Sequence, residues 1–249
     1  MSQTIRQLYD TARQAGRPLL GGHRGNPADN PENTLRSFRS AIDAGVDLIE
    51  CDVHLSSDRR LVVIHDHTLE RTTNGSGLVR DRTLNELRDL DAGEGEHIPL
   101  LEEVIETARG KVGLVIEIKQ IPIPYPDLEE KLIALLREKD FVEFSTVISF
   151  FHPSIRKLKE LEPSLHVGIL EGARPIDPAR MLSEAKADVY SPHWGAMDPD
   201  LVEAIHGVGG GVGVWTVDDD AAMMWCRLCR PDSIFTNRPS VVGPALRSF

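Results

Sequence analysis

Residues 47–53 have the sequence Asp-Leu-Ile-Glu-Cys-Asp-Val, and residues 113–118 have the sequence Gly-Leu-Val-Ile-Glu-Ile. Both runs are short and largely apolar, which is typical of strands that are buried on both faces of a parallel sheet. Six further runs of this kind lie along the chain, at residues 18–22, 146–150, 166–170, 188–190, 211–217 and 233–236. The sequence therefore predicts eight buried parallel strands.

Helical patterns lie between these runs. Leu35, Phe38 and Ile42 form an apolar stripe at helical spacing, which Gly45 can end. Further helical patterns cover residues 101–108, 128–135, 155–161, 178–185, 199–208 and 218–229, and residues 1–17 suit a short amphipathic helix. Parallel neighbouring strands need crossover connections, which are usually helical. We therefore expect an α/β fold in which residues 1–249 form a single (β/α)8 barrel of the TIM type.

One interval breaks the alternation of strand and helix. Residues 61–65 form an apolar run that follows Asp52 too closely for a crossover helix, so we expect a hairpin extension of the second strand. Residues 66–99 are rich in turn formers and contain one short helix, which Thr83 and Glu86 open at capping-box spacing. We interpret residues 66–99 as a compact insertion over the catalytic end of the barrel.

The composition excludes several classes of protein. The chain has 28 Lys and Arg against 39 Asp and Glu, a net charge of −11, so nucleic acid is not an expected partner. The 3 cysteines argue against a disulfide scaffold. No run approaches the roughly 20 apolar residues of a membrane-spanning helix, and residues 1–17 lack an apolar signal core. We expect a cytoplasmic enzyme or binding protein without stable membrane insertion.

Polar side chains follow the predicted strands at the points where these strands end, which is where barrel enzymes place their sites. Glu50 and Asp52 point to the same side of one strand because they are two residues apart. Glu117 and Lys119 do so on the next barrel strand. The other polar residues at or near strand ends are His23, Arg24, His65 and Trp215. We expect these side chains to meet at the mouth of the barrel.

The three acids Glu50, Asp52 and Glu117 form a hard-oxygen cluster without thiolates. Such a set suits Mg²⁺ or Ca²⁺ rather than a structural zinc ion. Each acid alone could instead cap a helix or pair with a surface cation. Together they interrupt apolar strands, and buried acids are costly unless they are paired or bind a metal. The sequence therefore predicts one divalent metal ion, with Mn²⁺ as a further candidate.

His23 and His65 are the candidate proton carriers, because imidazole gains or loses a proton near neutral pH. Arg24 and Lys119 also lie at or near predicted strand ends, and their cationic side chains could bind an anion. Two histidines, an acid cluster and two cations indicate a substrate whose charge is neutralised while a bond breaks. A phosphate ester is the substrate class that fits this set.

The ordered motifs of the chain resemble those of the glycerophosphodiester phosphodiesterase family. The motifs that carry the resemblance are Gly22-His23-Arg24-Gly25, Pro31-Glu32-Asn33-Thr34-Leu35, Ile49-Glu50-Cys51-Asp52-Val53, Val62-Val63-Ile64-His65-Asp66, Arg71-Thr72-Thr73-Asn74-Gly75, Ile116-Glu117-Ile118-Lys119, Val214-Trp215-Thr216-Val217 and Thr236-Asn237-Arg238-Pro239. They occur in the family's order and cover nearly the whole chain. Two residues near the last strand depart from the usual pattern, since Ser233 and Asn237 stand where Gly and Asp are typical.

The resemblance implies a metal-dependent barrel enzyme that hydrolyses glycerophosphodiesters to sn-glycerol 3-phosphate and an alcohol. It implies that the metal ligands are Glu50, Asp52 and Glu117 and that the general acid and base are His23 and His65. It also implies that Arg24 and Lys119 hold phosphate oxygens and that Trp215 forms a wall for the glycerol or the head group. Which histidine is the acid, and whether a cyclic phosphate forms on the way, stay open.

Three other functions are alternatives to this one. A lysophospholipase D-like enzyme would share the barrel and need an apolar surface around the mouth. A non-catalytic phosphoester-binding barrel would not require paired proton carriers. A sugar-phosphate isomerase or aldolase can use the same fold. The lone Cys226-x-x-Cys229 pair lies late in a helical stretch, so we interpret it as packing rather than as a redox or metal site.

Overall fold

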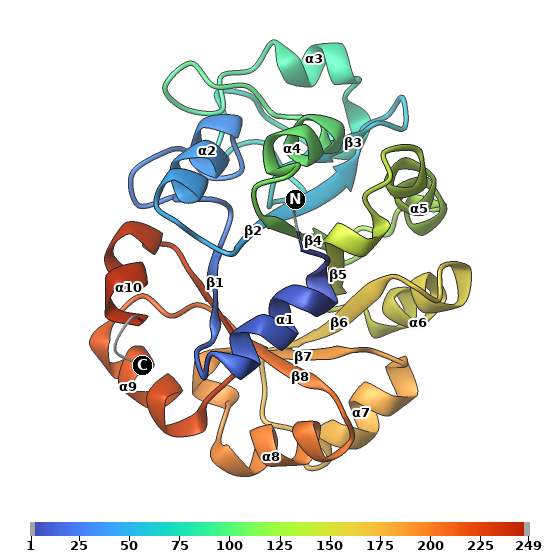
Figure 1. The fold of residues 1–249 in the computed structure, drawn as a ribbon. Helices are drawn as coiled ribbons and strands as arrows, with labels where there is room; N and C mark the ends of the chain where they lie inside the picture. Colours follow the sequence, from blue (N-terminus) through green and yellow to red (C-terminus); the bar gives the residue numbers. More distant parts are fainter. Residues whose placement is uncertain (1–2, 247–249) are drawn as a thin grey trace.

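The computed structural model describes residues 3–246 and contains a closed barrel of eight parallel strands (Figure 1). The barrel strands are β1 (Leu19–Gly22), β2 (Leu48–Leu55), β4 (Gly113–Ile118), β5 (Ser145–Ser149), β6 (His166–Glu171), β7 (Val189–Pro192), β8 (Gly211–Val214) and β9 (Ser233–Thr236). Pairing of β1 with both β2 and β9 closes the ring. The predicted (β/α)8 barrel is therefore confirmed.

Helices surround the barrel, and one helix closes an end of it. In chain order the helices are α1 (Ile5–Gln14), α2 (Leu35–Asp43), α3 (Leu84–Arg88), α4 (Leu101–Ala108), α5 (Leu128–Glu138), α6 (His152–Leu161), α7 (Pro178–Ala185), α8 (Pro199–Gly207), α9 (Asp220–Cys229) and α10 (Pro239–Leu246). Short 3₁₀ helices are η1 (Val79–Asp81), η2 (Val142–Phe144) and η3 (Trp194–Ala196). Within residues 3–246 no helix is long and apolar enough to cross a membrane.

Strand alternation sorts the side chains of β2 and β4 between two cores. Ile49, Cys51 and Val53 point outward and pack with the surrounding helices in the large apolar cluster. Leu48 and Val115 point inward and pack in the barrel interior. Cys51 therefore points away from the neighbouring acids, and burial raises the pKa of its thiol well above the ordinary value.

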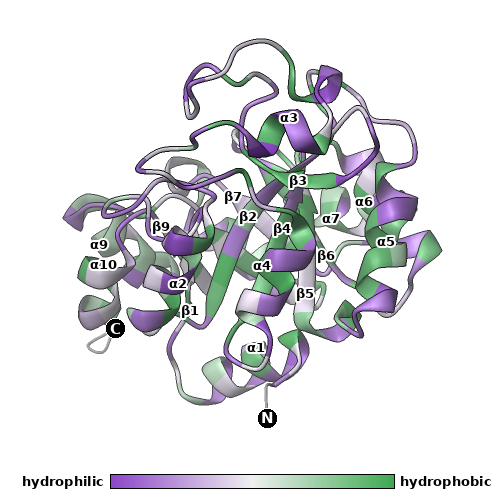
Figure 2. Cartoon of the chain, turned by 90° about the horizontal axis from the view of Figure 1, so that it is seen from above, coloured by the Kyte–Doolittle hydropathy of each residue, from purple (hydrophilic) through white to green (hydrophobic). Residues whose placement is uncertain are grey.

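Helix α1 closes the N-terminal end of the barrel, where it lies across the centre of Figure 1 and at the lower end of the side view in Figure 2. Thr4 caps it by accepting a hydrogen bond from the Gln7 N–H. Its buried face carries Ile5, Tyr9 and Ala12, which pack on the interior cluster. The Tyr9 hydroxyl forms a 3.1 Å hydrogen bond with Ser233 Oγ, so α1 is tied to the last strand.

The predicted hairpin extension is strand β3 (Leu61–Val63), which pairs antiparallel with β2. The chain that follows forms η1 and α3 and packs on β3 through a small apolar cluster of its own. Thr83 caps α3 by accepting from the Glu86 N–H, as the capping-box spacing predicted. In the side view α3 lies at the opposite end of the molecule from α1 (Figure 2). The boundaries of residues 66–99 as an insertion stay a prediction.

Acidification should unfold the protein partly through His166, a buried residue at the start of β6. Burial lowers the pKa of His166 from 6.5 to about 4, so the unfolded chain binds a proton across this pH window while the folded protein does not. Stability is therefore lost as the pH falls from 6.5 towards 4, by about 3 kcal/mol for this residue. We expect His166→Gln to flatten the pH dependence of urea unfolding by this amount, and parallel profiles would contradict the assignment.

Candidate active site

Three carboxylates come together inside the barrel on β2 and β4. The strand register places Asp52 beside Glu117, and Glu50 lies two residues before Asp52 on the same face. Each of the three residues offers one carboxylate oxygen, and these atoms all lie within 4.8 Å of one another. All three residues are buried. The structure brings together the three acids predicted from the sequence, and the cluster could hold a metal ion.

Two cations lie among these acids. Lys119 Nζ is 2.8 Å from Asp52 Oδ1 and also donates a hydrogen bond to Glu117. The backbone N–H of Arg24 donates to Glu50 Oε2 over 2.8 Å, and Arg24 Nε lies 3.5 Å from Asp52 Oδ2. Within residues 3–246, the buried atoms Arg24 Nε and Asp52 Oδ1 have no hydrogen-bond partner of good geometry. The cluster therefore leaves one N–H of Arg24 and one carboxylate oxygen of Asp52 without a well-formed hydrogen bond.

The three acids differ in pKa. Burial, followed by the neighbouring carboxylates, raises the pKa of Glu50 well above its ordinary value. Burial also raises the pKa of Glu117 to about 7, although Lys119 opposes this shift. Burial would raise the pKa of Asp52 too, but the nearby cations, first among them Lys119, outweigh it and hold the pKa below its ordinary value. Asp52 is therefore the firmly ionised member of the cluster.

His23 follows β1 and is held by a chain of hydrogen bonds. Its Nδ1 lies 2.8 Å from Asn237 Oδ1, and Asn237 Nδ2 donates to Asp218 Oδ2 over 2.7 Å. Because an ionised carboxylate only accepts hydrogen bonds, Asp218 turns the amide oxygen towards His23, which places the imidazole proton on Nδ1. Burial, followed by the charge of Arg24, lowers the pKa of His23 to about 4. At neutral pH His23 is a neutral imidazole with its lone pair on Nε2.

His65 lies just after β3 and has a carboxylate partner instead of an amide. Its Nδ1 is 2.6 Å from Asp66 Oδ1, so Nδ1 donates and the lone pair of the neutral ring lies on Nε2. Arg71 donates to Asp66 and also to Glu32. Glu32 in turn accepts from the guanidinium of Arg24 over 2.9 Å. Burial lowers the pKa of His65, whereas the Asp52 charge opposes that shift.

A cavity of about 130 Å³ contains both histidines in its lining. Arg24, Glu50 and Glu117 line it as well, and Asp52 and Lys119 form ion pairs with these lining residues. The predicted acids, histidines and cations thus form one connected group. Their individual catalytic roles stay predictions at this point.

Trp215 lies on the same cavity from the opposite side of the barrel, directly after β8. Its indole Nε1 donates to the Ser191 carbonyl over 3.0 Å. Its ring also packs edge-on against Phe150, with the ring centroids 5.6 Å apart. These contacts fix the indole as an apolar wall that faces the acids and histidines.

Sequence reasoning missed the residues that hold this group in place. Asn33 donates from Nδ2 to Asp52 Oδ2 over 2.7 Å, and its own backbone has a left-handed φ of 57°. Asparagine tolerates this conformation better than most residues. The further residues assigned no site role from the sequence are Glu32, Asp66, Arg71, Asp218 and Asn237. Of these residues, only Asn237, directly after β9, and Asp66, shortly after β3, carry a strand-end signal; the others lie further along loops.

Comparison with known proteins shows the family of this chain. Residues 23–241 match the model of the glycerophosphoryl diester phosphodiesterase family. The chain belongs to this family. A glycerophosphodiester phosphodiesterase of Caldanaerobacter subterraneus is 40% identical over 232 residues, which cover 90% of this chain and 96% of the relative. The predicted family and the prediction that the chain is a phosphodiesterase-family enzyme are confirmed.

Solved structures of the glycerophosphodiester phosphodiesterase family have the same barrel. A phosphodiesterase of Oleispira antarctica, solved in complex with the product sn-glycerol-3-phosphate, superimposes with a TM-score of 0.83 at 30% identity and covers 94% of this chain and 98% of its own. A glycerophosphodiester phosphodiesterase of Agrobacterium tumefaciens gives a TM-score of 0.79 at 30% identity, with 91% of this chain and 99% of its own covered. The fold therefore agrees with that of solved family members over nearly its whole length.

Replacement of the Asn237 amide by a carboxylate should change the pKa of His23 in this phosphodiesterase-family chain. In Asn237→Asp, a carboxylate would face His23 Nδ1 and raise the pKa of His23 from about 4. The same carboxylate would face Asp218 across the present 2.7 Å contact and destabilise the fold. Adding Asp218→Asn should restore stability while the His23 pKa stays raised. NMR titration and urea unfolding test both statements, and an unchanged His23 pKa in the double variant would contradict them.

Proposed function

We propose that the protein hydrolyses glycerophosphodiesters to sn-glycerol 3-phosphate and an alcohol, with a divalent metal ion and acid/base catalysis by histidine. One observation carries the proposal: His23 and His65 line the same cavity as Glu50 and Glu117, in a chain of the glycerophosphoryl diester phosphodiesterase family. The solved relative from Oleispira antarctica, which contains sn-glycerol-3-phosphate, supports this choice of product.

The donor set fits a divalent metal ion. Three buried carboxylates offer hard oxygen ligands close to one another, and Asp52 Oδ1 has no hydrogen-bond donor of good geometry within the described residues. We propose that Glu50, Asp52 and Glu117 hold Mg²⁺ or Ca²⁺, with Mn²⁺ as a further candidate. When bound, such an ion polarises a phosphoryl oxygen and neutralises charge that develops on it.

The cations of the cluster would bind the phosphoryl group. Arg24 lines the cavity, and Glu32 anchors its guanidinium from one side. Lys119 has a compact ammonium group next to Asp52 and Glu117. Burial alone would lower its pKa, but the charges of these acids outweigh burial and raise the pKa, so Lys119 stays protonated. Both residues would hold non-bridging phosphate oxygens, and Trp215 would provide an apolar wall for the glycerol or the alcohol.

The two histidines would move the protons of the reaction. Both use Nδ1 for a fixed partner and have Nε2 for the substrate. One Nε2 would take a proton from the nucleophile, which is water or the neighbouring glycerol hydroxyl. The other ring would act in its protonated form, as an imidazolium, and would donate the Nε2 proton to the oxygen of the departing alcohol. If the glycerol hydroxyl attacks, a cyclic phosphate forms first and is then opened by water.

Phosphorus NMR of glycerophosphocholine and glycerophosphoethanolamine tests the proposal directly. We expect no turnover by metal-stripped protein, and formation of glycerol 3-phosphate after Mg²⁺, Ca²⁺ or Mn²⁺ is added. A transient cyclic phosphate signal would identify the glycerol hydroxyl as the nucleophile. Turnover that is equal with and without chelator would contradict the metal role, and no turnover with any ion would favour a phosphoester-binding protein.

A second candidate substrate class has an observation of its own. The side chains Ile121, Phe150 and Phe151 follow β4 and β5 and are 51%, 37% and 40% exposed. An apolar rim beside the cavity could contact an acyl chain, which favours lysophospholipids as the second candidate. Lysophosphatidylcholine therefore belongs in the NMR panel. Faster release of choline from the lysolipid than from glycerophosphocholine would assign the protein to the lipid-directed class.

A further inference from the structure

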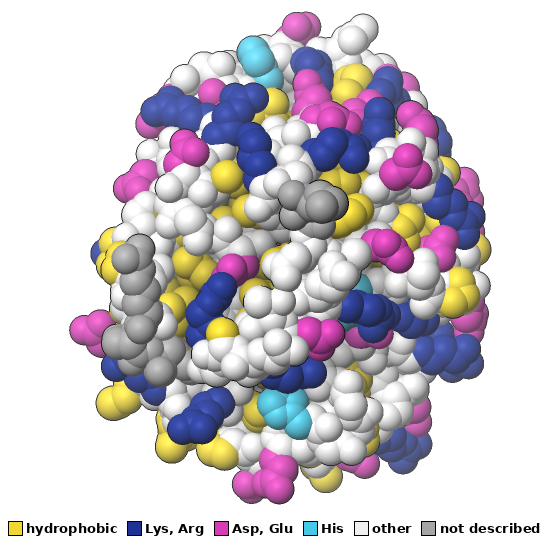
Figure 3. Space-filling model, viewed as in Figure 1, with side chains coloured by type: hydrophobic (Ala, Val, Ile, Leu, Met, Phe, Trp, Pro, Cys, Tyr) yellow, Lys and Arg dark blue, Asp and Glu magenta, His cyan; other side chains and the backbone are white. Residues whose placement is uncertain are grey.

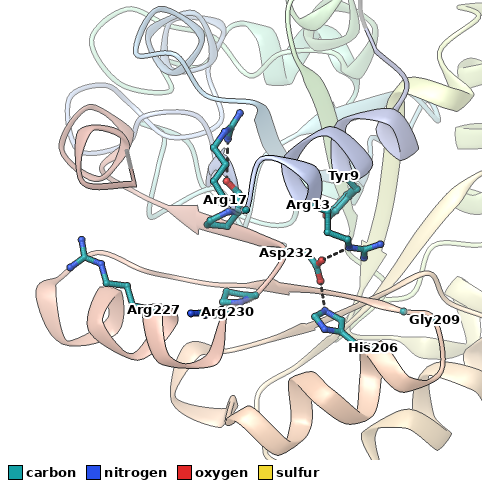
Figure 4. Close-up of a pocket in the computed structure, with 12 residues that line it drawn as sticks. Tyr9, Arg13, Arg17, His206, Gly209, Arg227, Arg230 and Asp232 are labelled. Carbon is teal, nitrogen blue, oxygen red and sulfur yellow. Dashed lines mark hydrogen bonds and ion pairs between the residues drawn. The ribbon is translucent and has the colours of Figure 1, made fainter. Parts of the chain in front are cut away.

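A second cavity lies at the opposite end of the barrel from the catalytic group, beside α1 (Figure 4). Its volume is about 620 Å³. We call it the floor cavity, and its charged lining residues are Arg13, Arg17, His206, Arg227, Arg230 and Asp232. The lining comes from helices α1, α8 and α9 and from the turns that precede β1, β8 and β9. Nothing in the proposed reaction uses this end of the molecule.

The floor cavity has four arginines and one histidine in its lining but a single acid, Asp232. That acid is already occupied: Arg13 Nε donates to Oδ1 over 3.0 Å, and His206 Nε2 and the Val212 N–H contact Oδ2 at 2.8 Å each. Arg17 is paired with Asp47 through two contacts of 2.7 and 2.9 Å. The two nearby acids, Asp232 and Asp47, therefore already pair with Arg13, Arg17 and His206.

The remaining two arginines have no acidic partner in the part of the chain that the structure describes. Arg227 donates only to the Ala245 carbonyl, over 3.3 Å. The Arg230 side chain makes no hydrogen bond or ion pair within residues 3–246, and its backbone has the left-handed φ of 55° at the end of α9. The chain as a whole has a net charge of −11, so this local excess of positive charge is opposite to its average.

The floor end of the barrel faces the viewer in Figure 3, where dark blue Lys and Arg side chains lie in the lower left part of the surface. In Figure 4, Arg17, Arg227 and Arg230 lie around one side of the floor cavity and His206 lies near its other side. Guanidinium groups present planar pairs of donors that match phosphate oxygens. Arginines from separate segments of the chain can contact separate phosphate groups of one small molecule.

We propose that the floor cavity is a second ligand site, which takes a small molecule with two or more phosphate groups. Tyr9 separates it from the catalytic cavity, because Tyr9 lines both. The floor site is thus distinct from the phosphoester site and does not depend on the proposed hydrolysis. Arg227 and Arg230 are its free cations, and Arg13 and Arg17 are paired cations at its border.

Calorimetric titration of metal-stripped protein with inorganic pyrophosphate, in the presence of chelator, tests the floor site. The test variant is Arg227→Gln with Arg230→Gly. Glycine adopts a left-handed backbone without strain, so this change removes a cation at a position where folding is retained. The matched control is Lys186→Gly, which removes a cation from the left-handed residue that ends α7. Lys186 does not line the floor cavity.

We expect one pyrophosphate per chain, with affinity that falls about tenfold or more in the double variant and stays within about twofold in the control. Added sn-glycerol 3-phosphate should not displace it, and phosphodiesterase activity of the metal-loaded double variant should equal that of the wild type. If the control variant lost as much affinity for pyrophosphate as the double variant, general surface charge would explain the effect, and the proposal would be overturned. Displacement by glycerol 3-phosphate, unchanged affinity in the double variant, or no binding would also overturn it.

Discussion

Replacement of Glu50 by Gln is expected to stabilise the metal-free protein and to lower turnover strongly. Glu50 is buried beside Asp52 and Glu117, and burial followed by these charges raises its pKa well above 4.5. Between pH 4.5 and the raised pKa, the folded protein retains a proton that the unfolded chain releases, so stability falls as the pH rises through this window. The substitution removes that loss, which we put at about 1–3 kcal/mol at neutral pH.

The same substitution should cost the enzyme its metal site. A neutral amide oxygen is a weaker ligand for a hard cation than a carboxylate. We expect the thermal stabilisation that Mg²⁺ or Ca²⁺ gives to the wild type to disappear in Glu50→Gln. Loss of several kcal/mol of charge stabilisation corresponds to a fall in kcat/KM of roughly 10³-fold. The gain in stability and the loss of activity would come from the same carboxylate.

Glu129 provides the matched control, because it is as buried as Glu50 but accepts hydrogen bonds from three side chains. Its carboxylate accepts hydrogen bonds from Gln120, Ser154 and Lys157. Burial would raise the pKa of Glu129, but these donors outweigh it and lower the pKa. Glu129→Gln should therefore destabilise the protein above pH 4.5 and leave metal binding intact. A loss of stability in Glu50→Gln of the same size as in Glu129→Gln would refute the view that Glu50 is strained in the metal-free state.

The acid cluster could be predicted because it depends on local rules. Strand alternation places Glu50 with Asp52 on one face, and the polar residues inside apolar runs mark the barrel interior. The register of β2 and β4 then brings Glu117 level with Asp52. Which strands are neighbours follows from the order of the barrel, so the sequence contained enough information for this step.

The partners of these residues could not be predicted in the same way. Asn33, Asn237 and Arg71 lie in loops, and loop contacts depend on tertiary distances that no periodic pattern encodes. The predicted strand at residues 211–217 also ends early, at Val214, and beyond it Trp215 keeps only an isolated parallel bridge to His193. Helix α10 was not predicted, since it contains Pro244 and a glycine. The floor cavity is likewise a product of turns far apart in the sequence.

Single replacement of His23 or His65 by Ala is expected to lower kcat by roughly 10²- to 10⁴-fold on glycerophosphocholine. Each ring lines the catalytic cavity and has its Nδ1 fixed by a partner, Asn237 in one case and Asp66 in the other. Loss of either ring removes one proton transfer and leaves the acid cluster in place. His97→Ala is the control, because His97 is exposed and lies outside the catalytic cavity.

A substrate with an activated leaving group separates the two roles. The p-nitrophenyl ester of glycerol 3-phosphate departs as a stable phenolate and needs no proton from the enzyme, whereas the nucleophile must still be deprotonated. We therefore expect this ester to restore most of the rate in the variant that lacks the general acid, and to leave the other variant slow. Identification of the acid follows from which variant is restored. Unchanged rates in both alanine variants on glycerophosphocholine would refute acid/base catalysis by this pair, and restoration of both variants would show that neither ring acts as the base.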